Sequence, residues 1–109
     1  MNDQVLKELY QVVLDRKAHP MEGSYTCYLF EKGLDKILKK VGEECAETII
    51  AAKNDVTSDT VGEISDLMYH LMVMMAELEI PLEDVLSELQ RRGQKIGNLK
   101  TMHVSDHNT

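Results

Sequence analysis

The segment Lys36-Ile-Leu-Lys-Lys-Val-Gly-Glu-Glu-Cys-Ala-Glu47 decides how this chain is interpreted, together with the shorter segment Glu63-Ile-Ser-Asp66 that follows it. The first segment places Glu44 three residues before its final glutamate, and the second has the same spacing between its two acids. Residues three apart in a helix lie about one turn from each other and share a side. Because a short connection favours antiparallel packing, we expect the two acidic pairs to meet between the two helices.

Two acidic pairs that meet at one point need a compensating charge. Close carboxylates repel each other unless they are protonated or hold a cation. A site built only from carboxylate oxygens favours a hard divalent ion, Mg²⁺ before Ca²⁺ or Mn²⁺. Because a metal ion held in this way usually serves a phosphate group, the pattern indicates phosphate chemistry.

Each of these acids also has an ordinary structural explanation. Glu63 can close a capping box with Thr60, since Thr-x-x-Glu is the expected spacing. Asp66 can bond the ring of His70 one turn on, and Glu43 can pair with a lysine on the helix surface. Neither the cap nor the histidine satisfies both acids of the second pair, but spacing alone leaves these alternatives open.

Apolar residues recur at helical spacing through most of the chain and predict an all-α fold with four main helices. Residues 1–93 are expected to form one domain, and residues 94–109, which lack this periodicity, a flexible C-terminal tail. The expected segments are a helix from Asn2 or Asp3 to Pro20, one or two helical turns around Tyr28 to Phe30, and helices over 34–53, 59–79 and Pro81 to Gly93.

The predicted helix over 59–79 is apolar on nearly all sides beyond Leu67. Such a helix needs more cover than three companion helices can give in a chain of 109 residues. This pattern favours a position at a subunit interface, and therefore at least a homodimer.

Composition and charge exclude several classes of function. The net charge of −7 argues against a nucleic-acid partner. The longest apolar run, 71–76, is too short to span a membrane, and the charged N-terminus does not resemble a signal peptide, so we expect a cytoplasmic protein. Basic residues gather at 32–40 and 91–100 around an acidic central region; they are either solvated helix ends or a surface that receives an anionic substrate.

Several motifs together carry a resemblance to a known superfamily. Glu-Glu-Cys-Ala-Glu (43–47) and Glu-Ile-Ser-Asp (63–66) resemble the EExxE…ExxD signature of the all-α nucleoside triphosphate pyrophosphatases, which include MazG-like enzymes and dimeric dUTPases. Within that superfamily the chain closely resembles the phosphoribosyl-ATP pyrophosphatase family of histidine biosynthesis, over about residues 3–93. The motifs that carry this closer resemblance are Gly-Ser-Tyr-Thr (23–26), Lys-Ile-Leu-Lys-Lys-Val-Gly-Glu-Glu (36–44) and Asp-Leu-Met-Tyr-His-Leu (66–71).

The resemblance implies a four-helix, MazG-like bundle completed by dimerisation. It also implies Mg²⁺-dependent hydrolysis of the α–β phosphoanhydride of phosphoribosyl-ATP, which yields phosphoribosyl-AMP and pyrophosphate. Two alternatives stay open. One is a house-cleaning pyrophosphatase that acts on other (deoxy)nucleoside triphosphates with the same metal motif; the other is a non-enzymatic helical dimerisation module whose acids merely face solvent.

The resemblance also assigns roles to individual residues. The role of His70 stays open between a neutral core histidine bonded to Asp66 and a catalytic group. The implied roles are Mg²⁺ ligation by Glu44, Glu47, Glu63 and Asp66, proton abstraction by Glu44 or Glu47, phosphate contacts by Lys40 and Lys53, other substrate contacts by Ser24, Tyr25, Thr26 and Arg91 or Arg92, and support from Glu43 and His70.

Overall fold

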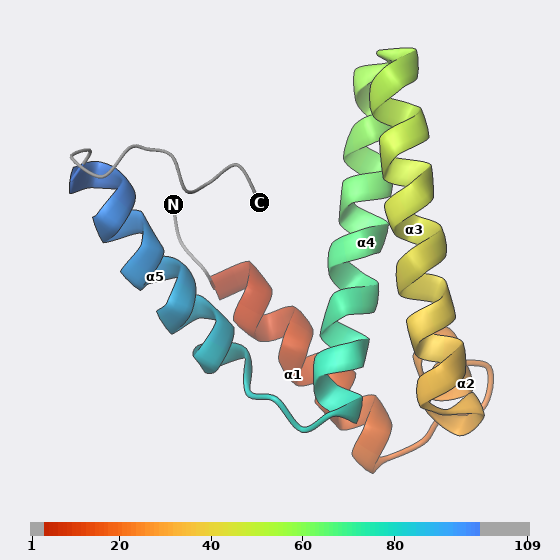
Figure 1. The fold of residues 1–109 in the computed structure, drawn as a ribbon. Helices are drawn as coiled ribbons and strands as arrows, with labels where there is room; N and C mark the ends of the chain where they lie inside the picture. Colours follow the sequence, from red (N-terminus) through yellow and green to blue (C-terminus); the bar gives the residue numbers. More distant parts are fainter. Residues whose placement is uncertain (1–3, 99–109) are drawn as a thin grey trace.

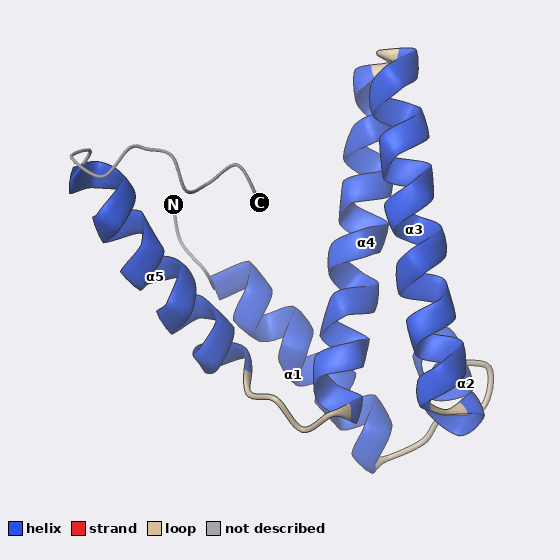
Figure 2. Cartoon of the chain, viewed as in Figure 1, coloured by secondary structure: helices blue, strands red, loops and turns tan. Residues whose placement is uncertain are grey.

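The computed structural model describes residues 4–98, and every regular element in that range is an α-helix (Figures 1 and 2). The all-α prediction is therefore confirmed for the described part of the chain. The short segment expected around Tyr28 is a helix of eight residues, so five helices are present there instead of four main ones. The helices are α1 (Gln4–Ala18), α2 (Tyr25–Lys32), α3 (Leu34–Asn54), α4 (Thr57–Glu77) and α5 (Leu82–Asn98).

Helices α3 and α4 form a long antiparallel hairpin (Figure 1). Helix α3 ends because Asp55 takes a left-handed conformation, with φ of 60°, and its backbone N–H donates to the carbonyls of Ala51 and Ala52. Only Asp55 and Val56 separate the two helices. A connection this short forces neighbouring, antiparallel packing, as the sequence predicted.

The apolar core lies at the base of this hairpin, where α1 and α2 pack against the first turns of α3 and the last turns of α4. Helix α5 is attached to the core by its first turns and then extends away from the hairpin (Figure 1). The buried core residues are Tyr10, Val13, Leu29, Ile37, Met72, Val73, Met75, Ala76 and Leu82.

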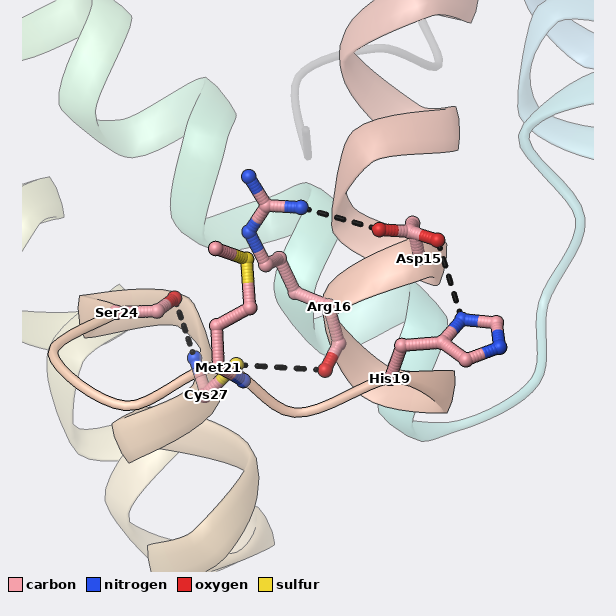
Figure 3. A network of polar contacts seen from close by, with 6 residues as sticks. All are labelled: Asp15, Arg16, His19, Met21, Ser24 and Cys27. Carbon is pink, nitrogen blue, oxygen red and sulfur yellow. Dashed lines mark hydrogen bonds and ion pairs between the residues drawn. The ribbon is translucent and has the colours of Figure 1, made fainter.

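A polar network fixes the start of α2 against the end of α1 (Figure 3). The Ser24 side chain caps α2 by accepting the backbone N–H of Cys27 at 3.1 Å. The Cys27 thiol donates to the carbonyl of Arg16 at 3.4 Å and accepts the backbone N–H of Met21 at 3.2 Å. These bonds hold the loop between α1 and α2 in place, and with it the orientation of the Tyr25 side chain in the first turn of α2.

The prediction that Gly93 closes the last helix is wrong, because α5 continues to Asn98. A glycine inside a helix costs only about 1 kcal/mol relative to alanine, and good helix formers flank it on both sides. Residues 94–98 are therefore helical. The rest of the predicted tail, 99–109, lies outside the described residues.

The most apolar part of α4 does not need a second chain to bury it, contrary to the expectation from the sequence. The strongly apolar part of α4, from Met72 to Ala76, packs in the core of its own chain. Exposed apolar residues also lie on the two helices of the outer half of the hairpin, away from that core. They include Ile49 and Ile50 on α3 and Val61, Ile64 and Met68 on α4.

This uncovered outer half gives the chain an open shape. The radius of gyration is 16.3 Å, whereas a compact domain of this length has about 13 Å. No helix within residues 4–98 is long and apolar enough to cross a membrane.

Candidate metal centre

Three carboxylates from the two hairpin helices meet at one point. Glu44 extends from α3, and Glu63 and Asp66 extend from α4, so that one oxygen of each lies within 4.8 Å of the others. The antiparallel packing of α3 on α4 produces this convergence, because it brings the middle of one helix beside the first half of the other.

Two oxygens of this cluster are buried and lack a hydrogen-bond partner: Oε1 of Glu44 and Oε1 of Glu63. Glu44 is only 6 % exposed. A buried acceptor without a partner is costly, and a carboxylate in that state more so. A divalent cation between the three carboxylates would satisfy both oxygens, so the donor set fits a hard metal ion such as Mg²⁺.

The carboxyl group of Glu63 is the most perturbed acid of the cluster. Its pKa rises from 4.5 to about 7, because its surroundings withdraw it from water and because Glu44 and Glu47 lie beside it. Glu47 is exposed and stands next to Glu63, outside the set of three. The four acids expected to ligate the metal therefore gather in one region, three in a tight cluster and Glu47 at its edge.

The structure removes the ordinary explanations for the second acidic pair. Helix α4 begins at Thr57, and the Thr60 hydroxyl donates to the carbonyl of Val56, so Thr60 does not cap the helix for Glu63. His70 bonds the backbone carbonyl of Asp66, not its carboxylate, at 2.7 Å. The two carboxylates are thus not engaged in the ways that local spacing suggested.

Lys40 is the cation nearest to the cluster. Its ammonium group lies 3.3 Å from Glu43 and 4.0 Å from the buried Glu44, and the bond to Glu43 raises the pKa of the lysine. Glu43 itself is exposed and pairs with this lysine, as the surface alternative for Glu43 suggested. Lys53 is exposed in the last turn of α3.

The structure does not bring the two candidate arginines to the cluster. Arg91 and Arg92 both pair with Glu88 on the surface of α5, and their guanidinium groups lower the pKa of Glu88 to about 2. Helix α5, which carries both arginines, extends away from the hairpin and from the acidic cluster on it (Figure 1).

Sequence reasoning missed a group of aromatic contacts that links α2 to α4. The His70 ring is buried, 4 % exposed, and its Nδ1 must donate to the Asp66 carbonyl, since a carbonyl can only accept. In the neutral ring Nε2 therefore accepts, and the Tyr25 hydroxyl donates to it at 3.0 Å. The hydroxyls of Thr26 and Tyr69 are also hydrogen bonded to each other.

These bonds place Tyr25 and Thr26 in structural roles next to the cluster, and Ser24 acts as the cap of α2. Tyr25 and His70 are 45 residues apart in the sequence, and Thr26 and Tyr69 are 43 residues apart. Helical periodicity carries no information at such separations, so only the shared family motifs pointed to this loop.

The fold and the site together define a class of protein: an all-α chain with an acidic site suited to a divalent ion. Residues 6–93 match the phosphoribosyl-ATP pyrophosphohydrolase family, and the chain belongs to that family.

Its relatives support this assignment along nearly the whole chain. It is 56 % identical over 99 residues to the phosphoribosyl-ATP pyrophosphatase of Clostridium novyi, covering 91 % of this chain and 90 % of the relative. It is 59 % identical over 92 residues to that of Listeria innocua, covering 84 % and 88 %. It is also similar to the histidine biosynthesis bifunctional protein HisIE of Thermoanaerobacter pseudethanolicus, with 63 % identity over 87 residues, which are 80 % of this chain but 40 % of that protein.

Proposed function

We propose that this protein hydrolyses phosphoribosyl-ATP to phosphoribosyl-AMP and pyrophosphate in histidine biosynthesis, by cleaving the α–β phosphoanhydride. The observation that carries the proposal is the three-carboxylate cluster, with two buried oxygens left unpaired, in a chain of the phosphoribosyl-ATP pyrophosphohydrolase family. The cluster explains anhydride cleavage, and the family supplies the choice of nucleotide.

Glu44, Glu63 and Asp66 are the proposed ligands of Mg²⁺. A bound Mg²⁺ would neutralise charge on the substrate phosphates and align them for attack by water. The protein's own contribution is to hold three ligands on two rigid helices, within 4.8 Å of one another, before any ion binds. Such preorganisation lowers the cost of assembling the site.

Glu47 is the proposed general base. It lies at the edge of the cluster and is exposed, whereas Glu44 is buried among the proposed ligands. A carboxylate that is not saturated by metal can orient a water molecule and take its proton. Of the two glutamates that the motif offered for this role, the exposed one reaches solvent and a substrate more easily.

Lys40 and Lys53 are the proposed contacts to phosphate oxygens. Lys40 already lies beside the cluster, at 4.0 Å from Glu44, so it can stabilise negative charge on the anhydride and on the departing pyrophosphate. Lys53 lies farther along α3, on the side of Glu47 away from Lys40. The role of Arg91 and Arg92 requires a second chain, since their own helix extends away from the cluster.

The functional unit is proposed to be at least a homodimer in the cytoplasm. The support is the outer half of the hairpin, whose two helices expose several apolar side chains, including Ile64 at 43 % and Ile49 at 65 %. Val61, Ile64 and Met68 follow helical spacing along one side of α4. A second copy that packs hairpin against hairpin would bury these residues and complete a four-helix bundle around the two acidic sites.

The test is to incubate the purified protein with phosphoribosyl-ATP and Mg²⁺ and to measure pyrophosphate release. We expect turnover that stops when the metal is chelated and that far exceeds turnover of ATP, dUTP or dCTP. Faster hydrolysis of a plain deoxynucleotide would favour a house-cleaning enzyme, and no hydrolysis of any triphosphate would favour a non-enzymatic dimerisation module.

One variant separates the general base from the metal ligands. Glu47→Gln should keep Mg²⁺ binding, seen as a raised melting temperature, but lose turnover by roughly 100-fold or more. Asp66→Asn should lose both. If Glu47→Gln retains near-normal turnover, Glu47 is not the base.

A further inference from the structure

A second group of charged and aromatic side chains lies on α2 and the first turn of α3, and the proposed chemistry does not use it. Tyr28 is exposed on α2, with 39 % of its surface accessible. The ammonium group of Lys32 lies 5.7 Å from the centre of its ring, and that of Lys36, from the first turn of α3, lies 5.9 Å away. Two cations thus share one exposed ring.

Neither of these lysines is neutralised by the protein. Among residues 4–98, no ion pair joins Lys32 or Lys36 to a carboxylate, although the chain as a whole has an excess of acids. Two like charges that lie within 6 Å of the centre of one ring, without a counter-charge, attract an anion to the surface around that ring. The ring itself attracts each ammonium group only weakly. The pair is therefore suited to a dianion, such as a phosphate monoester.

Tyr28 is also connected to the acidic cluster. Its ring stacks on that of Tyr25, with centroids 6.1 Å apart, and the Tyr25 hydroxyl bonds His70, which in turn bonds the backbone of Asp66. On α3, Lys36 precedes Glu44 by two turns, which is about 12 Å along the helix axis. The two lysines and the acidic cluster are therefore linked by a chain of side-chain contacts and lie about two helical turns apart along α3.

We propose that Tyr28, Lys32 and Lys36 bind the phosphoribosyl-adenine end of the substrate. This inference rests on the proposed function, because phosphoribosyl-ATP carries a triphosphate at one end and a second, monoester phosphate on the ribose attached to its adenine ring. The two lysines hold the monoester phosphate, and the Tyr28 ring supports the adjoining base. The triphosphate then points along α3 toward Lys40 and Glu44. Tyr28, Lys32 and Lys36 thereby distinguish the substrate from ATP, which lacks the second phosphate.

The test compares phosphoribosyl-AMP with AMP as ligands of the Mg²⁺-loaded protein, since the two differ only in the phosphoribosyl group. The wild type should bind phosphoribosyl-AMP at least tenfold more tightly. Lys32→Gln or Lys36→Gln should weaken phosphoribosyl-AMP about tenfold, as expected for one charged contact, and leave AMP unchanged. Tyr28→Leu should weaken both ligands, because both contain the base. Lys7→Gln, on α1, changes the net charge equally and should alter neither affinity.

Several results would overturn this subsite. Lysine variants that weaken AMP as much as phosphoribosyl-AMP, or that weaken neither, contradict it. A change in their oligomeric state by light scattering would also contradict it, because it would mean that a second copy covers the surface. If the protein hydrolyses phosphoribosyl-ATP but the lysine variants keep the wild-type affinities for phosphoribosyl-AMP and AMP, the subsite is overturned and the hydrolytic function stands. The binding difference without turnover supports the subsite and overturns the hydrolytic function.

Discussion

Replacing Tyr25 by phenylalanine removes a single hydroxyl group whose hydrogen bond joins α2 to α4. That hydroxyl donates to Nε2 of His70 across 3.0 Å, and His70 is buried. In the variant this nitrogen has no partner, and an unpaired buried polar group costs about 1–3 kcal/mol. Because 45 % of the Tyr25 surface is exposed, water can partly replace the lost partner, so we expect the lower half of that range, about 1–2 kcal/mol.

Urea or thermal unfolding at one fixed protein concentration measures this loss. For a domain of this size, 1 kcal/mol lowers the melting temperature by roughly 4–8 °C. Tyr28→Phe is the matched control, because it removes the same group from the same helix where, within residues 4–98, the hydroxyl makes no hydrogen bond; its effect should stay within about 0.5 kcal/mol.

A double-mutant cycle isolates the contact itself. His70→Leu removes the acceptor, so Tyr25→Phe should cost about 1 kcal/mol less in that background than in the wild type. The Asp66 carbonyl that loses the His70 ring lies inside a helix and keeps its backbone bond. Equal effects of Tyr25→Phe and Tyr28→Phe, together with an additive cycle, would refute the reasoning.

Three further predictions concern the metal, the pH and the assembly. Mg²⁺ at ten times its Kd should stabilise the wild type by about 1.4 kcal/mol in thermal shift, but not Asp66→Asn or Glu44→Gln; an equal shift in all three proteins would contradict the ligand set. Without metal, the raised folded-state pKa of Glu63, about 7 against 4.5, contributes stability that is complete below about pH 4.5 and is lost as the pH rises to about 7. Urea titrations should show this loss in the wild type and not in Glu63→Gln; parallel pH profiles would disprove it. Ile64→Glu should convert a dimeric wild type into monomers by light scattering, while a monomeric wild type at micromolar concentration would rule out the interface.

Local regularities made the acidic site predictable from the sequence. The acids at 44 and 47 and at 63 and 66 follow helical spacing, and the short connection expected between the helices favours antiparallel packing. Relative positions within a hairpin follow from helix geometry alone. The burial of Glu44 beside an exposed Glu43 was predictable for the same reason, since the two point in different directions from one helix.

What the sequence left open depends on contacts between distant segments. The bond from Tyr25 to His70 arises from how α2 sits on α4, which no periodic pattern encodes. The apolar part of the predicted 59–79 helix beyond Leu67 favours a subunit interface, but its most apolar segment, Met72 to Ala76, packs in the core of its own chain. A run of apolar residues does not specify which neighbour buries it. Gly93 was assigned to a helix end because glycine often ends helices, but flanking helix formers outweighed its modest cost.

The uneven burial along the α3–α4 hairpin has a consequence for its motions. The base of the hairpin is locked by core residues such as Ile37 and Val73, while near the tip, in the last turns of α3, Ala51 is buried and its neighbours are exposed. Amide hydrogens near the tip should therefore exchange with solvent through local opening, and those near the base only through global unfolding. The acidic cluster lies at the boundary between these regions. An ion that bridges both helices there would hold them together and slow the local opening of the tip. The protection of the tip amides from exchange would then report how much of the time the site is occupied by the ion.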